Sequence, residues 1–210
     1  RLKDDYVGVE HLLIAIADAA DAGAYRLSGT GGTVLREDFF QVVGGKKIDA
    51  ERDAMLPFYR RVAELTRSIN PDWLVFTESD PFHSFMGEGM PKGMPERMVN
   101  ASHWYDIVTL ATKTFMYPTA INPFNGRTLN GAKEIEDAYT HQLGRIKAAS
   151  ATIPGGAPTL LGEFGIPYDL DGGAAYAAGA RADRTDAPWE KHVIALDLMY
   201  NALDTHLMSS

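Results

Sequence analysis

One glutamate stands in a local sequence that is typical of an active-site carboxylate. The run Pro158–Pro167 (PTLLGEFGIP) leads from the apolar stretch Thr159–Leu161 almost directly into Glu163. Gly162 and Gly165 flank this glutamate, and glycines let a ligand or a neighbouring backbone approach closely. In parallel α/β folds the carboxyl ends of the strands carry the active site. The pattern therefore indicates either a catalytic carboxylate or a glutamate that caps the following loop.

A histidine and a tyrosine two positions apart form the second candidate group. His103 and Tyr105 lie in the segment Ala101–Asp106 (ASHWYD), and residues two apart on a strand point to the same face. Together they can hydrogen-bond a carboxylate or a sugar hydroxyl and hold a nucleophile in its ionised form. The alternative interpretation is a packed aromatic cluster with a satisfied histidine.

A second glutamate also follows a strand signal. Glu78 ends the segment Leu74–Glu78 (LVFTE). With Glu163 it forms a candidate carboxylate pair, because retaining glycosidases use a nucleophile and an acid/base about 5–5.5 Å apart. The sequence does not supply the distance between the two carboxylates.

Composition and missing motifs exclude several classes of protein. The 210 residues are 45% hydrophobic and 23% charged, with no cysteine and a net charge of −8. Disulfides, thiolate zinc sites and cysteine nucleophiles are excluded, and we expect no nucleic-acid partner for so acidic a chain. The six histidines are scattered, and neither a P-loop nor a Gly-x-Ser-x-Gly elbow occurs. We therefore expect no metal and no organic cofactor.

The sequence shows no segment that targets or anchors the protein. No run approaches the roughly 18 apolar residues of a membrane span, and the charged residues 1–10 show no signal peptide. We expect a soluble protein and assign it no compartment, because a chain trimmed of its leader would look the same.

The pattern of the chain changes near residue 50, and helices and strands alternate after it. Helical spacing of apolar residues predicts helices over 55–69, 135–146 and 193–207, the last from the stripe Val193, Leu196, Tyr200, Leu203 and Leu207. Short apolar runs predict strands over 73–76, 99–107 and 159–161. Such alternation implies parallel βαβ units, and three strands can supply only part of a (β/α)₈ barrel. We predict an α/β fold in which residues 51–210 form the C-terminal part of such a barrel.

Residues 1–50 are predicted to form a separate N-terminal helical segment. Its expected parts are a helix over 9–16, a flexible loop over 28–33, a second helical run over 35–43 and a linker over 46–52.

Four methionines recur every fourth residue in a stretch rich in glycine and proline: Met86, Met90, Met94 and Met98. They predict either a mobile apolar lid or ordinary packing of a long loop.

The segment from Leu56 to Ser210 resembles the second half of a family-five glycoside hydrolase, in particular the endoglycoceramidase branch. The resemblance rests on the runs FYRRVAEL, PDWLVFTE, SHWYDIVTL and LGEFGIPYDLD, which begin at Phe58, Pro71, Ser102 and Leu161. It implies that Glu163 is the catalytic nucleophile and that His103 and Tyr105 line the site beside it. We further expect three side chains to contact the substrate: Glu78, Trp104 and Tyr168.

This chain also departs from the family pattern. The family carries its acid/base glutamate in an Asn-Glu-Pro motif on the fourth barrel strand, and this sequence contains no such motif. Strands one to four have no counterpart, and the resemblance places the eighth strand just after Ser210. The acid/base is therefore not identified in this chain, and another chain is a candidate to complete the barrel.

The first 47 residues resemble a repeat of the Clp ATPase amino-terminal domain, a helical module that binds substrates or adaptors. The resemblance rests on the runs DDYVGVEHLLIAI from Asp4 and LREDFFQVVGG from Leu35.

Two functions of different classes follow. The first is retaining hydrolysis of a β-glycoside, of glycolipid or β-glucoside type, with Glu163 as nucleophile and no cofactor. The second is a non-catalytic binding module, or a fragment or chimera with a Clp-like start.

Overall fold

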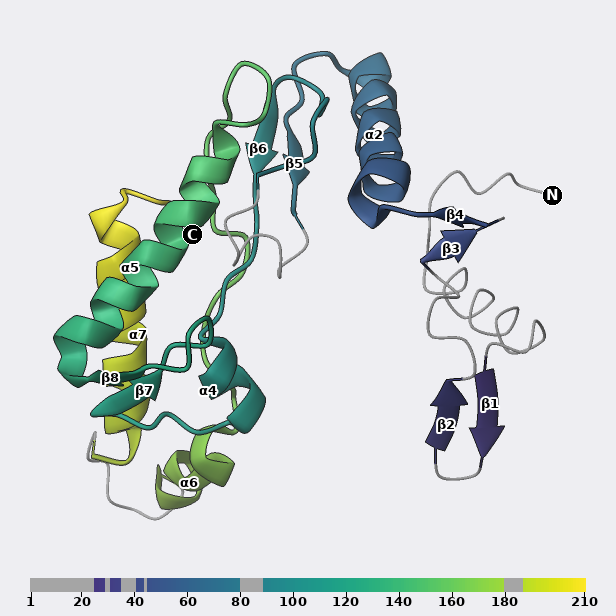
Figure 1. The fold of residues 1–210 in the computed structure, drawn as a ribbon. Helices are drawn as coiled ribbons and strands as arrows, with labels where there is room; N and C mark the ends of the chain where they lie inside the picture. Colours follow the sequence, from purple (N-terminus) through teal and green to yellow (C-terminus); the bar gives the residue numbers. More distant parts are fainter. Residues whose placement is uncertain (1–24, 29–30, 35–40, 44, 80–88, 180–186) are drawn as a thin grey trace. The chain divides into compact units, whose positions relative to one another are not determined.

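The computed structural model describes residues 25–28, 31–34, 41–43, 45–79, 89–179 and 187–210 (Figure 1). The chain divides into two compact units, Arg1–Met55 and Leu56–Ser210.

The described part of the first unit contains two short antiparallel hairpins. Strand β1 (Tyr25–Ser28) pairs with β2 (Gly31–Val34), and β3 (Val42–Val43) pairs with β4 (Lys46–Lys47). The π-helical segment η1 (Glu51–Met55) follows.

These hairpins differ from the predicted elements of the first unit. Ser28 and residues 31–33 of the predicted loop belong to the two strands of the first hairpin. Strand β3 lies at the end of the range 35–43, for which a helix was predicted. Two-residue connections rich in glycine favour hairpins, and the helical spacing of the apolar residues concealed this signal. The helix predicted over 9–16 lies outside the described residues.

The second unit is built on short parallel strands. Strand β5 (Val75–Thr77) pairs in parallel with β6 (Met98–Asn100). Beyond β6, Asn100 bridges to Thr159 and His103 bridges to Glu163, both in parallel. Residues 159–163 thus take the third position in the sheet, as the apolar run predicted.

A fourth strand position begins at the end of the chain. Leu160 bridges in parallel to Ser209, and the amide of Leu161 donates to the Ser209 carbonyl at 2.8 Å. The expectation that the eighth barrel strand lies beyond Ser210 is therefore wrong, because Ser209 already pairs with Leu160 in the third strand position. A few residues at a terminus are too short for hydrophobic periodicity to reveal a strand.

Helices alternate with these strands, as the pattern predicted. Those preceding residue 150 are α2 (Leu56–Ile69), α4 (Ile107–Thr112) and α5 (Gly131–Ser150). Those after it are α6 (Leu170–Gly179), the short 3₁₀ segment η2 (Ala187–Trp189) and α7 (Glu190–Thr205). An antiparallel hairpin, β7 (Thr119–Ile121) and β8 (Thr128–Asn130), precedes α5. Helices α5 and α7 lie side by side (Figure 1).

The larger core lies between α5, α7 and the third strand position. Its fully buried members include Trp104, Ile135, Leu143, Leu161 and Leu203. Burial of such side chains contributes roughly 1.5–3 kcal/mol each.

Helix α7 buries only part of its predicted stripe, with Leu203 in the core and Leu196 packed against it. Val193 and Tyr200 are 59% and 51% exposed, whereas Ala195, Leu198 and Ala202 are buried. The helix is apolar on more than one side, so sequence spacing alone did not identify the face that packs against α5.

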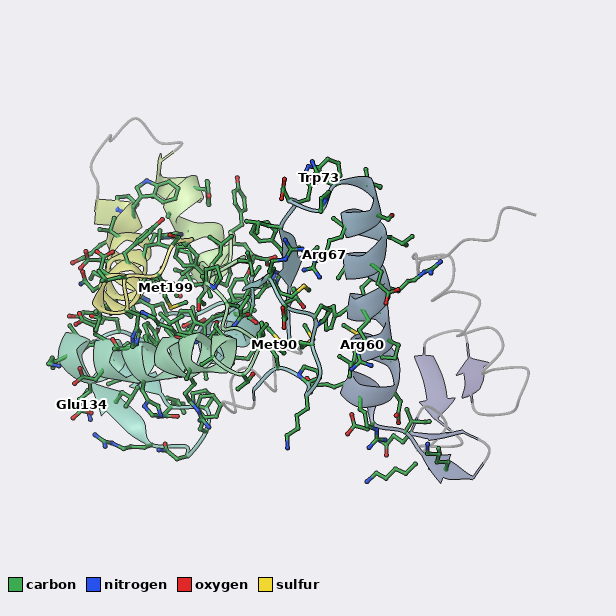
Figure 2. All side chains as sticks on the ribbon, turned by 90° about the horizontal axis from the view of Figure 1, so that it is seen from above. Arg60, Arg67, Trp73, Met90, Glu134 and Met199 are labelled. Carbon is green, nitrogen blue, oxygen red and sulfur yellow. The ribbon has the colours of Figure 1, made fainter. Side chains whose placement is uncertain are left out.

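A smaller core lies under α2. Met90, Met94 and Met98 are buried there with Leu56 and Tyr59. Figure 2 shows Arg60 and Arg67 on α2, with Met90 on the segment beside this helix. The guanidinium groups of the two arginines donate to carbonyls of Gly93 and Arg97. These methionines therefore pack a loop onto α2, while Met86 lies outside the described residues.

Candidate active site

Glu163 projects from the carboxyl end of the third strand position, beside the end of β6. The backbones pair there, because the Trp104 amide donates to the Glu163 carbonyl at 3.0 Å and the Gly162 amide donates to the Ser102 carbonyl at 3.2 Å. A Cβ on Gly162 would lie 2.4 Å from the Ala101 carbonyl oxygen. Only glycine fits at this position, and it brings Glu163 close to His103 and Tyr105.

Both carboxylate oxygens of Glu163 are contacted from the neighbouring strand. The Tyr105 hydroxyl donates to Oε1, and Nδ1 of His103 lies 3.5 Å from Oε2. The side chain of Glu163 remains 56% exposed, so a ligand can reach it. The two contacts fix the orientation of a solvent-accessible carboxylate.

Glu78 joins the same cluster from the end of β5. Its Oε1 lies 3.0 Å from Nδ1 of His103. Two carboxylates therefore approach one imidazole nitrogen, and this arrangement requires Nδ1 to carry a proton, since a carboxylate only accepts. His103 thus connects Glu78 to Glu163.

The phenol of Tyr105 is held in its neutral form. Burial, and after it the hydrogen bond to Glu163, raises the pKa of Tyr105 to about 12. A phenol with this pKa remains a donor throughout the neutral and mildly alkaline range.

Three contacts position Glu78 and the backbone around it. The Tyr59 hydroxyl on α2 donates to the Glu78 carbonyl. The Ala101 amide donates to the Thr77 carbonyl at 2.7 Å, and the Ser79 amide lies 3.3 Å from Oγ of Ser102. The end of β5 is therefore tied both to α2 and to the strand that carries His103.

A buried polar network beneath the cluster holds β6 in place. Asn100 is fully buried, and its Oδ1 accepts from the amide and, at 2.7 Å, from the hydroxyl of Ser102. Its Nδ2 donates to the Ile146 carbonyl and, at 2.9 Å, to the Ser150 hydroxyl on α5. Sequence patterns did not predict this role for Asn100. The signal that could have indicated it is the pair of polar residues, Asn100 and Ser102, next to an apolar strand.

A second network fixes the segment that follows Tyr105. Asp106 caps α4 by accepting from the amides of Val108 and Thr109, and it accepts from the Tyr139 hydroxyl at 2.6 Å. Burial, and after it the charge of Asp106, raises the pKa of Tyr139 above its usual range. No local pattern indicated this pairing, because the two residues are 33 positions apart.

Trp104 lies in the core and not in the cluster. It is fully buried, its Nε1 donates to Oε1 of Gln142 at 2.9 Å, and its ring meets Tyr139 edge-on. Side chains alternate along a strand, so Trp104 points away from the face that His103 and Tyr105 share. A buried side chain offers no surface to a substrate, and the prediction for Trp104 is wrong for this structure.

Tyr168 lies on the chain that leaves Glu163 and is 77% exposed. Its ring stacks on Tyr176 of α6, with centroids 4.6 Å apart. The structure thus brings Glu78, His103, Tyr105 and Glu163 together and places Tyr168 on a separate aromatic surface.

Among the described residues, no group of three or more histidine and acidic side chains is arranged to hold a metal ion. No helix in the described ranges is both long and apolar enough to cross a membrane.

The arrangement of strands and helices is that of part of a (β/α)₈ barrel. The chain is similar to the solved structure of sterylglucosidase 1 from Cryptococcus neoformans, with a TM-score of 0.67 and 24% identity, over 88% of this chain and 26% of that one. At this identity the likeness establishes the fold alone. No protein-family model matches the sequence.

Curated relatives are glucosylceramidases of fungi. One from Cryptococcus neoformans var. grubii is 27% identical over 186 residues, which is 83% of this chain and 24% of the relative. One from Rhizopus delemar is 25% identical over 182 residues, which is 82% of this chain and 23% of the relative. The chain therefore spans about a quarter of the length of these proteins.

These comparisons support a glycosidase-like chain and give no support to a Clp-like repeat. A match to 83% of the chain is longer than the unit Leu56–Ser210, so it includes part of the first unit. Some of residues 1–55 thus align with the same glucosylceramidase as the barrel segment does.

Proposed function

We propose that this chain contributes the nucleophile half of a retaining β-glycosidase site that acts on glycolipid or β-glucoside substrates. The observation that carries the proposal is that Tyr105 and His103 contact the two different oxygens of Glu163 at the carboxyl end of a parallel strand. Similarity to glucosylceramidases supports the substrate class.

Glu163 acts as the nucleophile in the proposed reaction. One carboxylate oxygen attacks the anomeric carbon, the bond to the aglycone oxygen breaks, and that oxygen leaves with a proton from the acid/base. Water then attacks the glycosyl ester, gives its proton to the same acid/base and releases the sugar with its original configuration.

Tyr105 and His103 are positioning residues in this proposal. They orient the carboxylate so that its remaining lone pairs face the ligand. The hydrogen bonds from Tyr105 and His103 then weaken when Glu163 becomes an ester, because the carboxylate loses its charge. The neutral Tyr105 supports such a role, because an ionised phenolate beside Glu163 would repel its charge.

We assign Glu78 the role of orienting His103. Its Oε1 is the nearer of the two carboxylate contacts at Nδ1, so it favours the tautomer in which this nitrogen donates. The acid/base then comes from outside the motifs of this chain. The rest of a longer protein, or another chain, would supply it together with the other barrel strands.

Exposed apolar side chains on and before β5 support an incomplete barrel. Leu74 and Phe76 are 60% and 55% exposed, while Val75 between them is buried. Both faces of a barrel strand are normally covered, so we propose that the remaining strands cover Phe76.

The function is tested with dinitrophenyl β-glucoside in the presence of azide, followed by proton NMR. This leaving group needs little help from an acid, so the test does not depend on the missing residue. We expect the β-glucosyl azide, formed with retention, and no product from Glu163→Gln. An α-configured product, or an unchanged rate in Glu163→Gln, would overturn the proposal, and no product from either protein would favour a non-catalytic module.

A further inference from the structure

An aromatic surface lies beside the proposed site and has no role in the chemistry described above. Tyr168 stacks on Tyr176 with ring centroids 4.6 Å apart and an interplanar angle of 29°. Tyr176 in turn meets Trp189 edge-on, with centroids 4.8 Å apart. We call these three residues the aromatic ladder.

Three separate segments build the aromatic ladder. Tyr168 follows the strand that ends at Glu163, Tyr176 belongs to α6 and Trp189 ends η2. Helix α6 lies beyond the ends to which β5 and β6 point (Figure 1). The ladder therefore stands on the same side of the sheet as Glu163.

The ladder offers ring surface to the solvent. Tyr168 is 77% exposed and Tyr176 is 38% exposed. Large aromatic side chains are usually buried more deeply than this, and exposed groups of them mark binding surfaces. Partial desolvation, and after it a hydrogen bond with Tyr168, raises the pKa of Tyr176, so its hydroxyl stays neutral.

Two ion pairs border the ladder. Lys113 contacts Asp169 at 2.7 Å, next to Tyr168 in sequence. Lys191 contacts Asp171 at 2.7 Å, close to Trp189 in sequence. Each cation meets one carboxylate, so the border offers a ligand no uncompensated charge from these four groups. Such a surface suits an uncharged ligand.

The ladder lies within reach of a ligand held at Glu163. Tyr168 lies five positions after Glu163, and extended chain spans at most about 3.3–3.6 Å per residue, or about 18 Å in all. When the single sugar of a β-glucoside occupies the site at Glu163, the aglycone is the part of the ligand that can extend to the ladder.

We propose that the aromatic ladder binds the aglycone of the β-glycoside through the face of Tyr168, and that it selects a flat, uncharged, apolar ring system. This inference rests on the function proposed above and adds the class of aglycone. Flat rings lie against the Tyr168 face over their whole area, and stacking of this kind contributes about 1–3 kcal/mol for a base on an aromatic side chain. A flexible chain covers less of the face and loses more conformational freedom when it does.

Calorimetric binding to Glu163→Gln, which cannot turn the ligand over, tests the proposal. The probes are 4-methylumbelliferyl β-glucoside, with a flat aglycone, methyl β-glucoside and cellobiose. We expect the flat aglycone to bind at least tenfold more tightly than methyl β-glucoside. Adding Tyr168→Ala should weaken the flat ligand about tenfold and leave methyl β-glucoside unchanged, and Tyr168→Phe should restore the affinity.

Trp73→Ala is the matched control, because Trp73 is an exposed aromatic residue (53%) near the end of α2 (Figure 2). It should change none of the affinities. Since Tyr168 is so exposed, its truncation leaves the core intact, and an unchanged unfolding midpoint verifies this.

Three patterns of measured affinity would overturn the inference. They are an unchanged affinity for the flat ligand in Tyr168→Ala, an equal loss for methyl β-glucoside, and a loss confined to cellobiose, which would assign the ladder to a second sugar. Absence of all binding would also overturn it. Whether the proposed function fails with it is decided separately, by covalent labelling of Glu163, which needs no aglycone contact.

Discussion

The hydroxyl of Tyr105 donates a hydrogen bond to Oε1 of Glu163 from the adjoining parallel strand. The two residues are 58 positions apart in the sequence, and Gly162 permits the close approach of their strands. This one contact ties the orientation of the proposed nucleophile to the pairing of the strands.

Removing the Tyr105 hydroxyl should slow covalent labelling of Glu163 by a fluoroglucoside. A hydrogen bond to a charged group contributes about 1.5–3 kcal/mol, so Tyr105→Phe should slow labelling by about ten- to a hundredfold. Tyr117→Phe is the control, because Tyr117 stacks on Phe115 away from the cluster. Equal labelling rates in Tyr105→Phe and the native chain would show that the contact does not position Glu163.

Alkaline titration should report the Tyr105 contact directly. Its folded pKa of about 12 lies above the ordinary tyrosine value of 10.0, so the neutral phenol stabilises the fold. This contribution is fully present below pH 10 and is lost as the pH rises toward 12. Native protein should therefore lose more stability than Tyr105→Phe between pH 10 and 12, measured by urea unfolding. Parallel curves for the two proteins would contradict the assignment.

Glu78→Gln should separate the orienting role from acid/base catalysis. An amide can still accept from Nδ1 of His103, so we expect only a several-fold loss in the labelling rate and no rescue by azide. Glu78→Ala removes the acceptor and should cost more. A large loss of turnover on a poor leaving group, together with acceleration by azide on the dinitrophenyl glucoside, whose departure needs no acid, would instead identify Glu78 as the acid/base.

Gly162→Ala should destabilise the second unit. The new methyl group would lie 2.4 Å from the Ala101 carbonyl oxygen, which is backbone and cannot rotate away, so we expect a loss of about 1–3 kcal/mol. Gly144→Ala is the control, since its neighbour is the His206 side chain and alanine favours a helix. Equal unfolding free energies for the two variants would contradict this explanation of the strand pairing.

Asp106→Ala should cost about 2–4 kcal/mol of unfolding free energy. It removes the cap of α4 and leaves the buried Tyr139 hydroxyl without its acceptor. Asp137→Ala, which breaks only the exposed pair with Lys133, should cost at most about 0.5 kcal/mol. A cost for Asp106→Ala as small as that of the control would show that the buried network contributes little.

Local patterns in the sequence predicted the parts of the site that are set by strand periodicity. The alternation of His103, Trp104 and Tyr105 placed the first and third on one face, and the glycine–glutamate step after an apolar run marked the end of a strand. The same alternation argues that Trp104 belongs to the opposite, buried face, which the expectation for this residue overlooked.

Long-range pairing was beyond reach of such patterns. The approach of Glu78 to His103 depends on the register of β5 and β6, and the burial of Asn100 depends on α5 packing over the sheet. Ser209 pairs with Leu160 although no apolar run surrounds it. Register and packing come from the whole fold, whereas periodicity reports one segment at a time.

The most direct test of the nucleophile assignment is the intact mass of the protein after incubation with dinitrophenyl 2-deoxy-2-fluoro-β-glucoside, followed by peptide mapping. We predict a single fluoroglucosyl adduct on Glu163, and none in Glu163→Gln. A galactoside probe of the same design distinguishes a different sugar preference from an absent nucleophile. A folded protein that forms no adduct with either probe, or an adduct on another residue, would contradict the assignment of Glu163.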